Sequence, residues 1–213
     1  MKRLFIAINL PPHLKKIIAK SVDNLISIRC GGLPDEAKNI RWLSPENWHL
    51  TISFLGYQPD EAIGPILESI KETVKEHSNI LKNVGMSTDQ RGVRVEFEKI
   101  IWAPPDKPAR MIWLTGTKET SKKLDEIKNH LENELIKNDV KFQPENRSYN
   151  AHLTLARFQP APINMDTISI NQFLNQHKSA LSFQAQSLDL MESHLKRTGA
   201  EYEILTSVNF QKV

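Results

Sequence analysis

The chain has 213 residues, 28 lysines and arginines against 25 acidic residues, and one cysteine, Cys30. A single cysteine excludes an intrachain disulfide and a metal site built from several cysteines, and it favours a reducing compartment, so we expect a cytoplasmic protein. The formal net charge of +3 is compatible with a phosphate-bearing substrate without indicating one. The apolar run after Lys2 and Arg3 meets Asn9 and Pro11 too early to export the chain or to span a membrane.

Apolar periodicity and the positions of proline and glycine predict the elements in chain order. We expect a strand at 4–10, a helix from 12 to about 29, a short strand at 40–43, a strand from about 48 to 55 that Gly56 ends, and a helix at 60–77. Next come short strands near 81–86, 93–97, 100–103 and 110–116, a helix at 118–137 and a strand at 150–158. The last expected elements are a helix at 166–177 and strands at 181–191 and 201–210. Interleaved helices and hairpins predict an α+β fold of two lobes with a cleft between them.

One tetrapeptide occurs twice: His49-Leu50-Thr51-Ile52 returns as His152-Leu153-Thr154-Leu155. Both copies alternate polar and apolar side chains with the period of a half-buried strand, so histidine and threonine share one face and the aliphatic residues point into a core. The copies are separated by about half the chain. We therefore place one copy in each lobe and expect the two to build one site.

Two histidines that face each other can divide the roles of acid and base, because imidazole alone among unperturbed side chains titrates near neutral pH. This arrangement suits the in-line opening of a phosphodiester. Thr51 and Thr154 could hold the non-bridging phosphate oxygens by hydrogen bonds. No metal or cofactor is needed, and a metal on His49 and His152 would require further ligands that neither copy supplies.

The segments IRWLSPENWHLTISFLG, HLTLAR and GAEYEIL, with the opening RLFIAI, resemble the RNA 2′,3′-cyclic phosphodiesterase (2′-5′ RNA ligase-like) branch of the two-histidine (2H) phosphoesterase superfamily. The likeness covers most of the chain, in order. It implies a single domain over residues 1–213, made of two lobes with pseudo-symmetric antiparallel sheets flanked by helices. Each lobe would carry one His-x-Thr-x motif.

The resemblance also implies an activity, the opening of a terminal RNA 2′,3′-cyclic phosphate to a 2′-phosphomonoester without metal. It makes His49 the proton donor to the leaving 3′ oxygen and His152 the proton acceptor that activates water. Arg157 matches the arginine after the family's second motif and is a candidate phosphate ligand, although strict alternation from His152 would turn it away from the site.

Two further groups of residues could contact RNA. Phe5, Trp42 and Tyr149 could stack on a base, or they could simply pack in the core or at its rim. The basic residues that could contact phosphates, or could merely be solvated, are Arg41, Arg147, Lys196 and Arg197.

Our leading hypothesis is therefore a cytoplasmic, metal-independent hydrolase in RNA processing, acting on RNA with 2′,3′-cyclic phosphate ends. An alternative within the superfamily is a 2′-5′ RNA ligase, or a phosphodiesterase acting on a small cyclic nucleotide phosphate. The alternative from another class is a non-catalytic module that binds RNA ends or nucleotides. We expect a monomer with no membrane partner and no cofactor.

Overall fold

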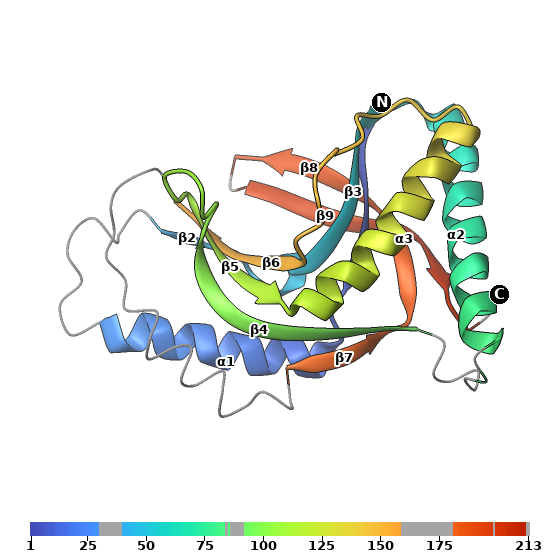
Figure 1. Cartoon of the computed structure of the whole chain (residues 1–213). Coiled ribbons are helices and arrows are strands. Elements are labelled where there is room, and N and C mark those ends of the chain that lie inside the picture. The colour runs from blue at the N-terminus through green and yellow to red at the C-terminus, as the bar shows by residue number, and fades with distance from the viewer. Residues whose placement is uncertain (30–39, 84, 86–91, 159–180, 198, 212–213) are drawn as a thin grey trace.

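Two antiparallel β-sheets and three α-helices make up the described part of this computed structural model, which comprises residues 1–29, 40–83, 85, 92–158, 181–197 and 199–211 (Figure 1). In the four-stranded sheet the order is β3 (His49–Gln58), β1 (Lys2–Asn9), β8 (Ser187–Lys196) and β9 (Gly199–Asn209). In the five-stranded sheet the order is β2 (Arg41–Trp42), β6 (His152–Arg157), β5 (Met111–Gly116), β4 (Val93–Ala103) and β7 (Ser182–Ala185). This arrangement confirms the predicted fold class.

The two sheets are not consecutive halves of the chain. β2 lies early in the sequence but joins the five-stranded sheet, and β8 and β9 return to the four-stranded sheet beside β1. Each sheet nevertheless carries one copy of the repeated tetrapeptide, at the start of β3 and at the start of β6. The assignment of residues 1–213 to one domain of two lobes stays a prediction.

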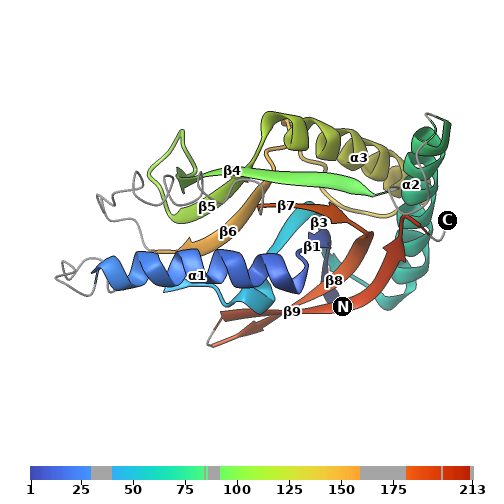
Figure 2. The ribbon, with the colours of Figure 1, turned by 90° about the horizontal axis from the view of Figure 1, so that it is seen from below.

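The helices are α1 (Pro12–Arg29), α2 (Ile63–Asn83) and α3 (Lys118–Lys137), with short 3₁₀ turns at Pro45–Asn47 and Asp60–Ala62. α2 and α3 pack side by side, and Figure 2 shows α1 and α3 on opposite sides of β4. The Thr117 side chain caps α3 by accepting a hydrogen bond from the amide of Thr120. The apolar positions at three- and four-residue spacing in α3 are all buried, as the sequence predicts: Leu124, Ile127, Leu131 and Leu135.

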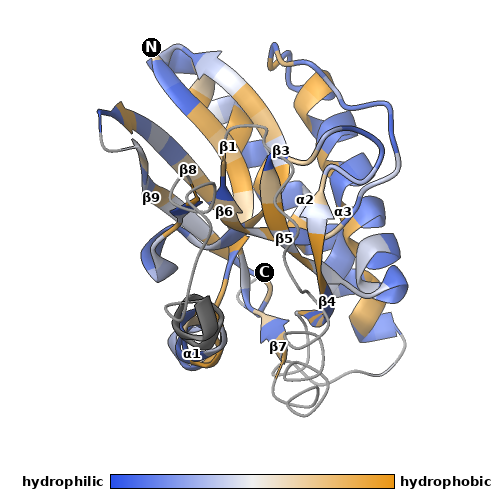
Figure 3. Ribbon diagram, turned by 90° about the vertical axis from the view of Figure 1, so that its left-hand side faces the viewer, coloured by the Kyte–Doolittle hydropathy of each residue, from blue (hydrophilic) through white to orange (hydrophobic). Residues whose placement is uncertain are grey.

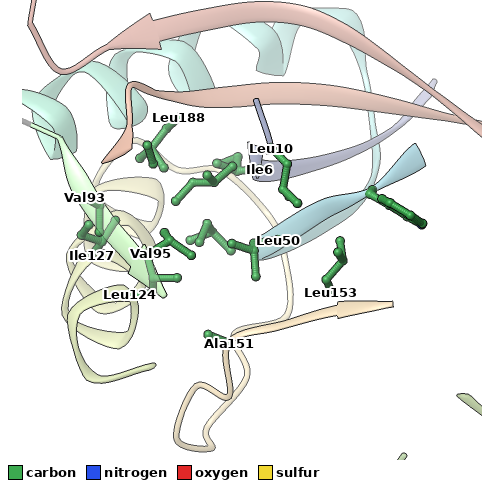
Figure 4. Packing of buried hydrophobic residues seen from close by; sticks show 14 of the residues in the cluster. Ile6, Leu10, Leu50, Val93, Val95, Leu124, Ile127, Ala151, Leu153 and Leu188 are labelled. Carbon is green, nitrogen blue, oxygen red and sulfur yellow. The ribbon is translucent and has the colours of Figure 1, made fainter. Parts of the chain in front are cut away.

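The main core lies between the two sheets and α3. Figure 4 shows Ile6 and Leu50 of one sheet meeting Val95 and Leu153 of the other, with Leu124 beside them. All five side chains are fully shielded from solvent. Figure 3 shows the same division along the chain, with hydrophobic colour on the inner parts of β1 and β3 and hydrophilic colour on the outward turns of α2 and α3. Burial of these apolar side chains is the main favourable contribution to folding.

Several expected boundaries were wrong. Gly56 does not end the strand from residue 48, because its φ of 71° accommodates an irregularity in the pairing with β1, and β3 continues to Gln58. The expected strand near 81–86 begins inside α2, whose last turns are held by the Ser78 hydroxyl donating to the Phe210 carbonyl. The strands expected at 93–97 and 100–103 are one strand, β4.

The expected strand at 181–191 is two strands, because the chain changes sheets at Gln186. β7 pairs with β4 and β8 pairs with β1. The helix expected at 166–177 lies outside the described residues. No helix in the described ranges is long and apolar enough to cross a membrane. The cytoplasmic location stays a prediction.

A buried ion pair connects α3 to both motif strands. Lys128 Nζ lies 2.9 Å from Glu132 Oε2, and the side chains are 4% and 11% exposed. Lys128 also donates to the carbonyl of Glu145, in the segment that leads to β6. Ser53 of β3 donates to the other oxygen of Glu132, at 3.4 Å. The pair therefore satisfies polar groups from three parts of the chain.

We predict that replacing one partner of this pair is far more damaging than replacing both. Lys128→Met leaves the Glu132 carboxylate buried without its cation, which should lower the free energy of unfolding by about 3–5 kcal/mol. The double variant Lys128→Met with Glu132→Leu should recover most of that loss. Urea denaturation of the three proteins measures the difference, and equal losses in the single and double variants would contradict the prediction.

Candidate active site

The two copies of the tetrapeptide lie against each other, because β3 and β6 are in contact although they belong to different sheets. His49 is the first residue of β3 and is paired with Asn9 of β1. His152 is the first residue of β6 and is paired with Thr115 of β5. The two histidines are close enough for the charge of one to affect the pKa of the other. The structure therefore brings the two repeats into one place.

Both motif strands contain a β-bulge at the same position. From each histidine onward the six residues are half-buried, buried, half-buried, buried, buried and exposed. The pairing shifts at Ile52 in β3, where Ala7 faces Thr51 and Ile6 faces Ser53. It shifts at Leu155 in β6 in the same way. Two consecutive buried residues break the alternation, so the sixth residue returns to the face of histidine and threonine.

This bulge corrects the expectation that Arg157 points away from the site. Arg157 shares the face of His152 and Thr154, and its charge contributes to lowering the pKa of both His49 and His152. The corresponding residue of β3 is Phe54, which is exposed and pairs with Phe5. The two motifs are thus alike for five residues and differ in chemistry at the sixth.

The two imidazoles are held by the same hydrogen bond. Nδ1 of His49 lies 2.9 Å from the carbonyl oxygen of Asn47, and Nδ1 of His152 lies 2.7 Å from the carbonyl oxygen of Asn150. Because a carbonyl oxygen can only accept, each Nδ1 carries a proton and donates it. Nε2 is therefore the working nitrogen of both histidines, a base when the ring is neutral and an acid when it is charged.

Aromatic rings pack around both histidines. The His49 ring lies 4.9 Å from Phe5 and 4.8 Å from Tyr202, measured between ring centroids. The His152 ring stacks on Trp113 at 3.8 Å. Phe5 is only 2% exposed and packs against His49 and Tyr202, so it supports the histidine and offers no free face to a base. This packing corrects the stacking expectation for Phe5.

Burial lowers the pKa of both histidines. For His49, desolvation is the main cause, the bond to Asn47 opposes it, and the charges of Lys15, Arg157 and His152 lower the pKa further, to about 4. For His152, desolvation again dominates and the bond to Asn150 opposes it, with further lowering by Arg147 and Arg157. Near neutral pH the site of the free protein therefore holds two neutral imidazoles beside several cations.

The other sequence candidates occupy distinct places. Thr51 and Thr154 lie on the histidine face, and neither hydroxyl is hydrogen-bonded within the described residues. Tyr149 is half-buried, its hydroxyl donates to the Thr51 carbonyl at 2.7 Å, and burial raises its pKa. The stacking of its ring on a base stays a prediction. Trp42 is half-buried against the core, and its contact with a base stays a prediction.

Three residues of the site were not foreseen. Trp113 comes from β5, and no local pattern indicates that it stacks on His152. Tyr202 lies within GAEYEIL, a segment that supports the family resemblance without revealing its contact with His49. Lys15 lies on the hydrophilic side of α1, where its Nζ donates to the Glu46 carbonyl and its charge reaches His49.

One group of possible metal ligands occurs within the described ranges, and it excludes both motif histidines. Glu192, His194 and Glu203 lie on β8 and β9, with ligand atoms within 4.8 Å of one another. His194 contacts both carboxylates, and Lys2 forms an ion pair with Glu192. These contacts explain why the three side chains lie close together without a metal ion.

The sequence matches the model of a known protein family. The model described as the AKAP7 2′5′ RNA ligase-like domain matches residues 13–210, which is most of the chain. The chain belongs to this family, within the two-histidine phosphoesterase superfamily. Both motifs lie inside the matched range.

Two archaeal relatives extend the comparison. The RNA 2′,3′-cyclic phosphodiesterase of Methanocaldococcus jannaschii is 24% identical over 205 residues, which cover 95% of this chain and 98% of the relative. The protein of the same name from Methanothermobacter thermautotrophicus is 24% identical over 203 residues, covering 94% of each chain. The similarity thus extends over nearly the full length of both relatives.

Solved structures share the fold. E. coli LigT complexed with 3′-AMP matches with a TM-score of 0.65 at 20% identity, covering 98% of this chain and 97% of LigT. TT0787 of Thermus thermophilus matches with a TM-score of 0.63 at 19% identity, covering 98% of each chain. At these identities the likeness establishes the arrangement of strands and helices.

We predict that His49 stays neutral well below the usual range of histidine. Its ring resonances should titrate near pH 4, and those of His152 below 6.5, when followed by NMR against pH. Because the unfolded chain binds this proton more tightly, the contribution of His49 to stability is present above about pH 6.5 and is lost as pH falls toward 4. A His49 midpoint above pH 6 would contradict the prediction.

Proposed function

We propose that the protein hydrolyses RNA 2′,3′-cyclic phosphate ends to 2′-phosphomonoesters by acid–base catalysis with two histidines. The observation that carries the proposal is the matched pair of imidazoles, each held through Nδ1 by a backbone carbonyl so that Nε2 is the reactive nitrogen. The names of the two archaeal relatives support the same activity.

The reaction needs one neutral and one protonated imidazole. Nε2 of His152 accepts a proton from water, and the water oxygen forms a new bond to phosphorus. The bond between phosphorus and the 3′ oxygen breaks, and Nε2–H of His49 donates its proton to that oxygen. The 2′ oxygen keeps its bond to phosphorus, and proton exchange with solvent then restores both histidines.

The low pKa of His49 in the free protein fits this role once the substrate is considered. The cations Lys15 and Arg157 contribute to keeping His49 neutral when no ligand is bound. A cyclic phosphate carries one negative charge, and an anion beside an imidazole favours its charged form. Substrate binding therefore raises the pKa of His49 and supplies the acid at the moment it is needed.

Two threonines and one arginine complete the phosphate site in this proposal. The Thr51 and Thr154 hydroxyls lie on the histidine face and can donate to the non-bridging oxygens. Arg157, returned to that face by the bulge at Leu155, offers charge-assisted hydrogen bonds to the same oxygens. Such donors stabilise the negative charge that develops as water attacks.

The same groups could serve a second reaction. If an RNA hydroxyl replaces water as the attacking group, His152 and His49 keep their roles and a 2′-5′ linkage forms. The family description names a 2′5′ RNA ligase-like domain, which favours including this reaction. Parallel assays of hydrolysis and of ligation on one cyclic-phosphate substrate separate the two activities.

The proposal also includes a monomeric protein and an RNA substrate.

We expect His49→Ala and His152→Ala each to lower kcat/KM for a cyclic-phosphate oligonucleotide by about 10²–10⁴-fold, because each removes a proton-transfer group. His130→Ala, which changes a histidine of α3, is the control and should keep full activity. Product analysis by the position of the phosphate should give the 2′-phosphomonoester. Near-wild-type turnover in either motif variant, or loss of activity on addition of EDTA, would contradict the mechanism; tight binding without turnover would indicate a non-catalytic module.

The pH dependence should differ between the free and the bound protein. kcat/KM reports the free protein, in which both histidines have pKa values below 6.5, so it should fall as pH rises above about 6.5. kcat reports the complex, in which the phosphate raises both pKa values, so its bell-shaped profile should lie at higher pH. Initial rates at limiting and saturating substrate between pH 4 and 9 test this. A kcat/KM that keeps rising through pH 9 is incompatible with the assignment.

A further inference from the structure

We propose that Arg41, opposite Arg157, forms a second anion subsite, which binds the phosphate on the 5′ side of the terminal nucleoside and makes the site prefer an oligonucleotide end over a nucleoside cyclic phosphate. The inference rests on the proposed function, because it places the reacting phosphate at the two histidines. The substrate feature that the site would recognise, in addition to the cyclic phosphate, is the 5′ phosphate.

The first observation is a pair of like charges on neighbouring strands. Arg41 of β2 lies directly opposite Arg157 of β6, and both residues are exposed. Like charges in this position destabilise a sheet. Neither guanidinium forms an ion pair with a carboxylate in the part of the chain that the structure describes. An anion bound at each guanidinium would offset the repulsion.

The second observation is that Arg41 reaches across to the other sheet. Its guanidinium lies so close to Gly199, at the start of β9, that a Cβ atom added to Gly199 would overlap it. Gly199 has a φ of 132°, so glycine both permits this backbone and leaves room for the arginine. Arg41 is thereby held between β6 and the β8–β9 hairpin, next to the strand that carries Tyr202.

The acidic side chains of the hairpin are already engaged. Glu201 is paired with Lys196, and Glu203 with His194. Among the described residues of the hairpin, no carboxylate forms an ion pair with Arg41. Two positive charges without an ion-pair partner among the described residues therefore lie next to each other: Arg157 beside the histidines and Arg41 at the hairpin.

The chemistry of the ligand follows from this arrangement of Arg41 beside Arg157. With the cyclic phosphate at the histidines and Arg157, the next anion available to Arg41 is a phosphate on the 5′ oxygen of the same nucleoside. A nucleoside 2′,3′-cyclic phosphate has no such group, whereas an RNA end has one. Charge-assisted hydrogen bonds from arginine to phosphate are strong, so the difference should be measurable.

Three uridine substrates test the proposal: uridine 2′,3′-cyclic phosphate, its 5′-phosphorylated form, and the dinucleotide UpU with a terminal cyclic phosphate. The wild-type protein should show a kcat/KM about tenfold higher for the two substrates with a second phosphate. Arg41→Met should remove that preference. Arg94→Met, which removes an exposed arginine paired with Glu96 on β4, is the matched control and should keep it.

Two further measurements separate the charge of Arg41 from its position. Gly199→Ala should displace the guanidinium without removing it and should also reduce the preference, with circular dichroism as the check on folding. The slope of log KM against log salt should be steeper by about 0.7 for the dinucleotide than for the mononucleotide in the wild type, and equal for both in Arg41→Met.

The outcomes distinguish this inference from the proposed function. If Arg41→Met lowers kcat/KM for all three substrates by one factor, or if the wild type shows no preference, the subsite is refuted while the hydrolase proposal stands. A preference for the dinucleotide alone would point to the second base and also refute it. If the wild type hydrolyses none of the three, the hydrolase proposal fails, and equal Kd values for the mononucleotides with and without the 5′ phosphate would refute the subsite as well.

Discussion

A hydrogen bond from the Tyr149 hydroxyl to the backbone carbonyl oxygen of Thr51 joins the two halves of the site. The two motif strands lie in different sheets, so within the described residues no ladder of backbone hydrogen bonds fixes one relative to the other. Their relative position depends on side chains: the shared apolar core, the buried pair of Lys128 and Glu132, and this tyrosine. Because acid–base catalysis requires donor and acceptor within hydrogen-bonding reach of one phosphate, the chemistry depends on contacts that are buried behind the histidines.

The electrostatics of the site follow from the same burial. Two imidazoles packed against Phe5, Tyr202 and Trp113 lose hydration, which disfavours their charged forms. The neighbouring cations act in the same direction, so the free protein keeps both bases neutral while holding a positive potential beside them. An incoming phosphate therefore changes the protonation of the site that receives it. The affinity for the anion and the generation of the acid are linked through one set of charges.

Much of the fold and part of the site could be predicted from the sequence. Apolar spacing gave the position of α3, and the duplicated His-x-Thr pattern identified the two strands whose first residues meet. The rest depends on pairing between distant strands. The bulge that turns Arg157 toward the site is a property of β5 and β6 together, and strict alternation along β6 alone predicts the opposite direction. The roles of Trp113 and Arg41 also depend on distant residues, since Trp113 stacks on His152, 39 positions later in the chain, and Arg41 lies against Gly199 of the other sheet.

Phe54 and Arg157 occupy equivalent positions after the two bulges, and this single difference has a consequence for directionality. A site with full twofold symmetry would bind a ligand in two opposite orientations with equal free energy, and half of the encounters would be unproductive. An arginine on one side and an aromatic ring on the other make the two orientations unequal. A difference of about 1.4 kcal/mol already gives a tenfold excess of one orientation, and a hydrogen bond to a charged group contributes about 1.5–3 kcal/mol. Two strands with the same backbone can thus form a site that binds its ligand in one preferred orientation.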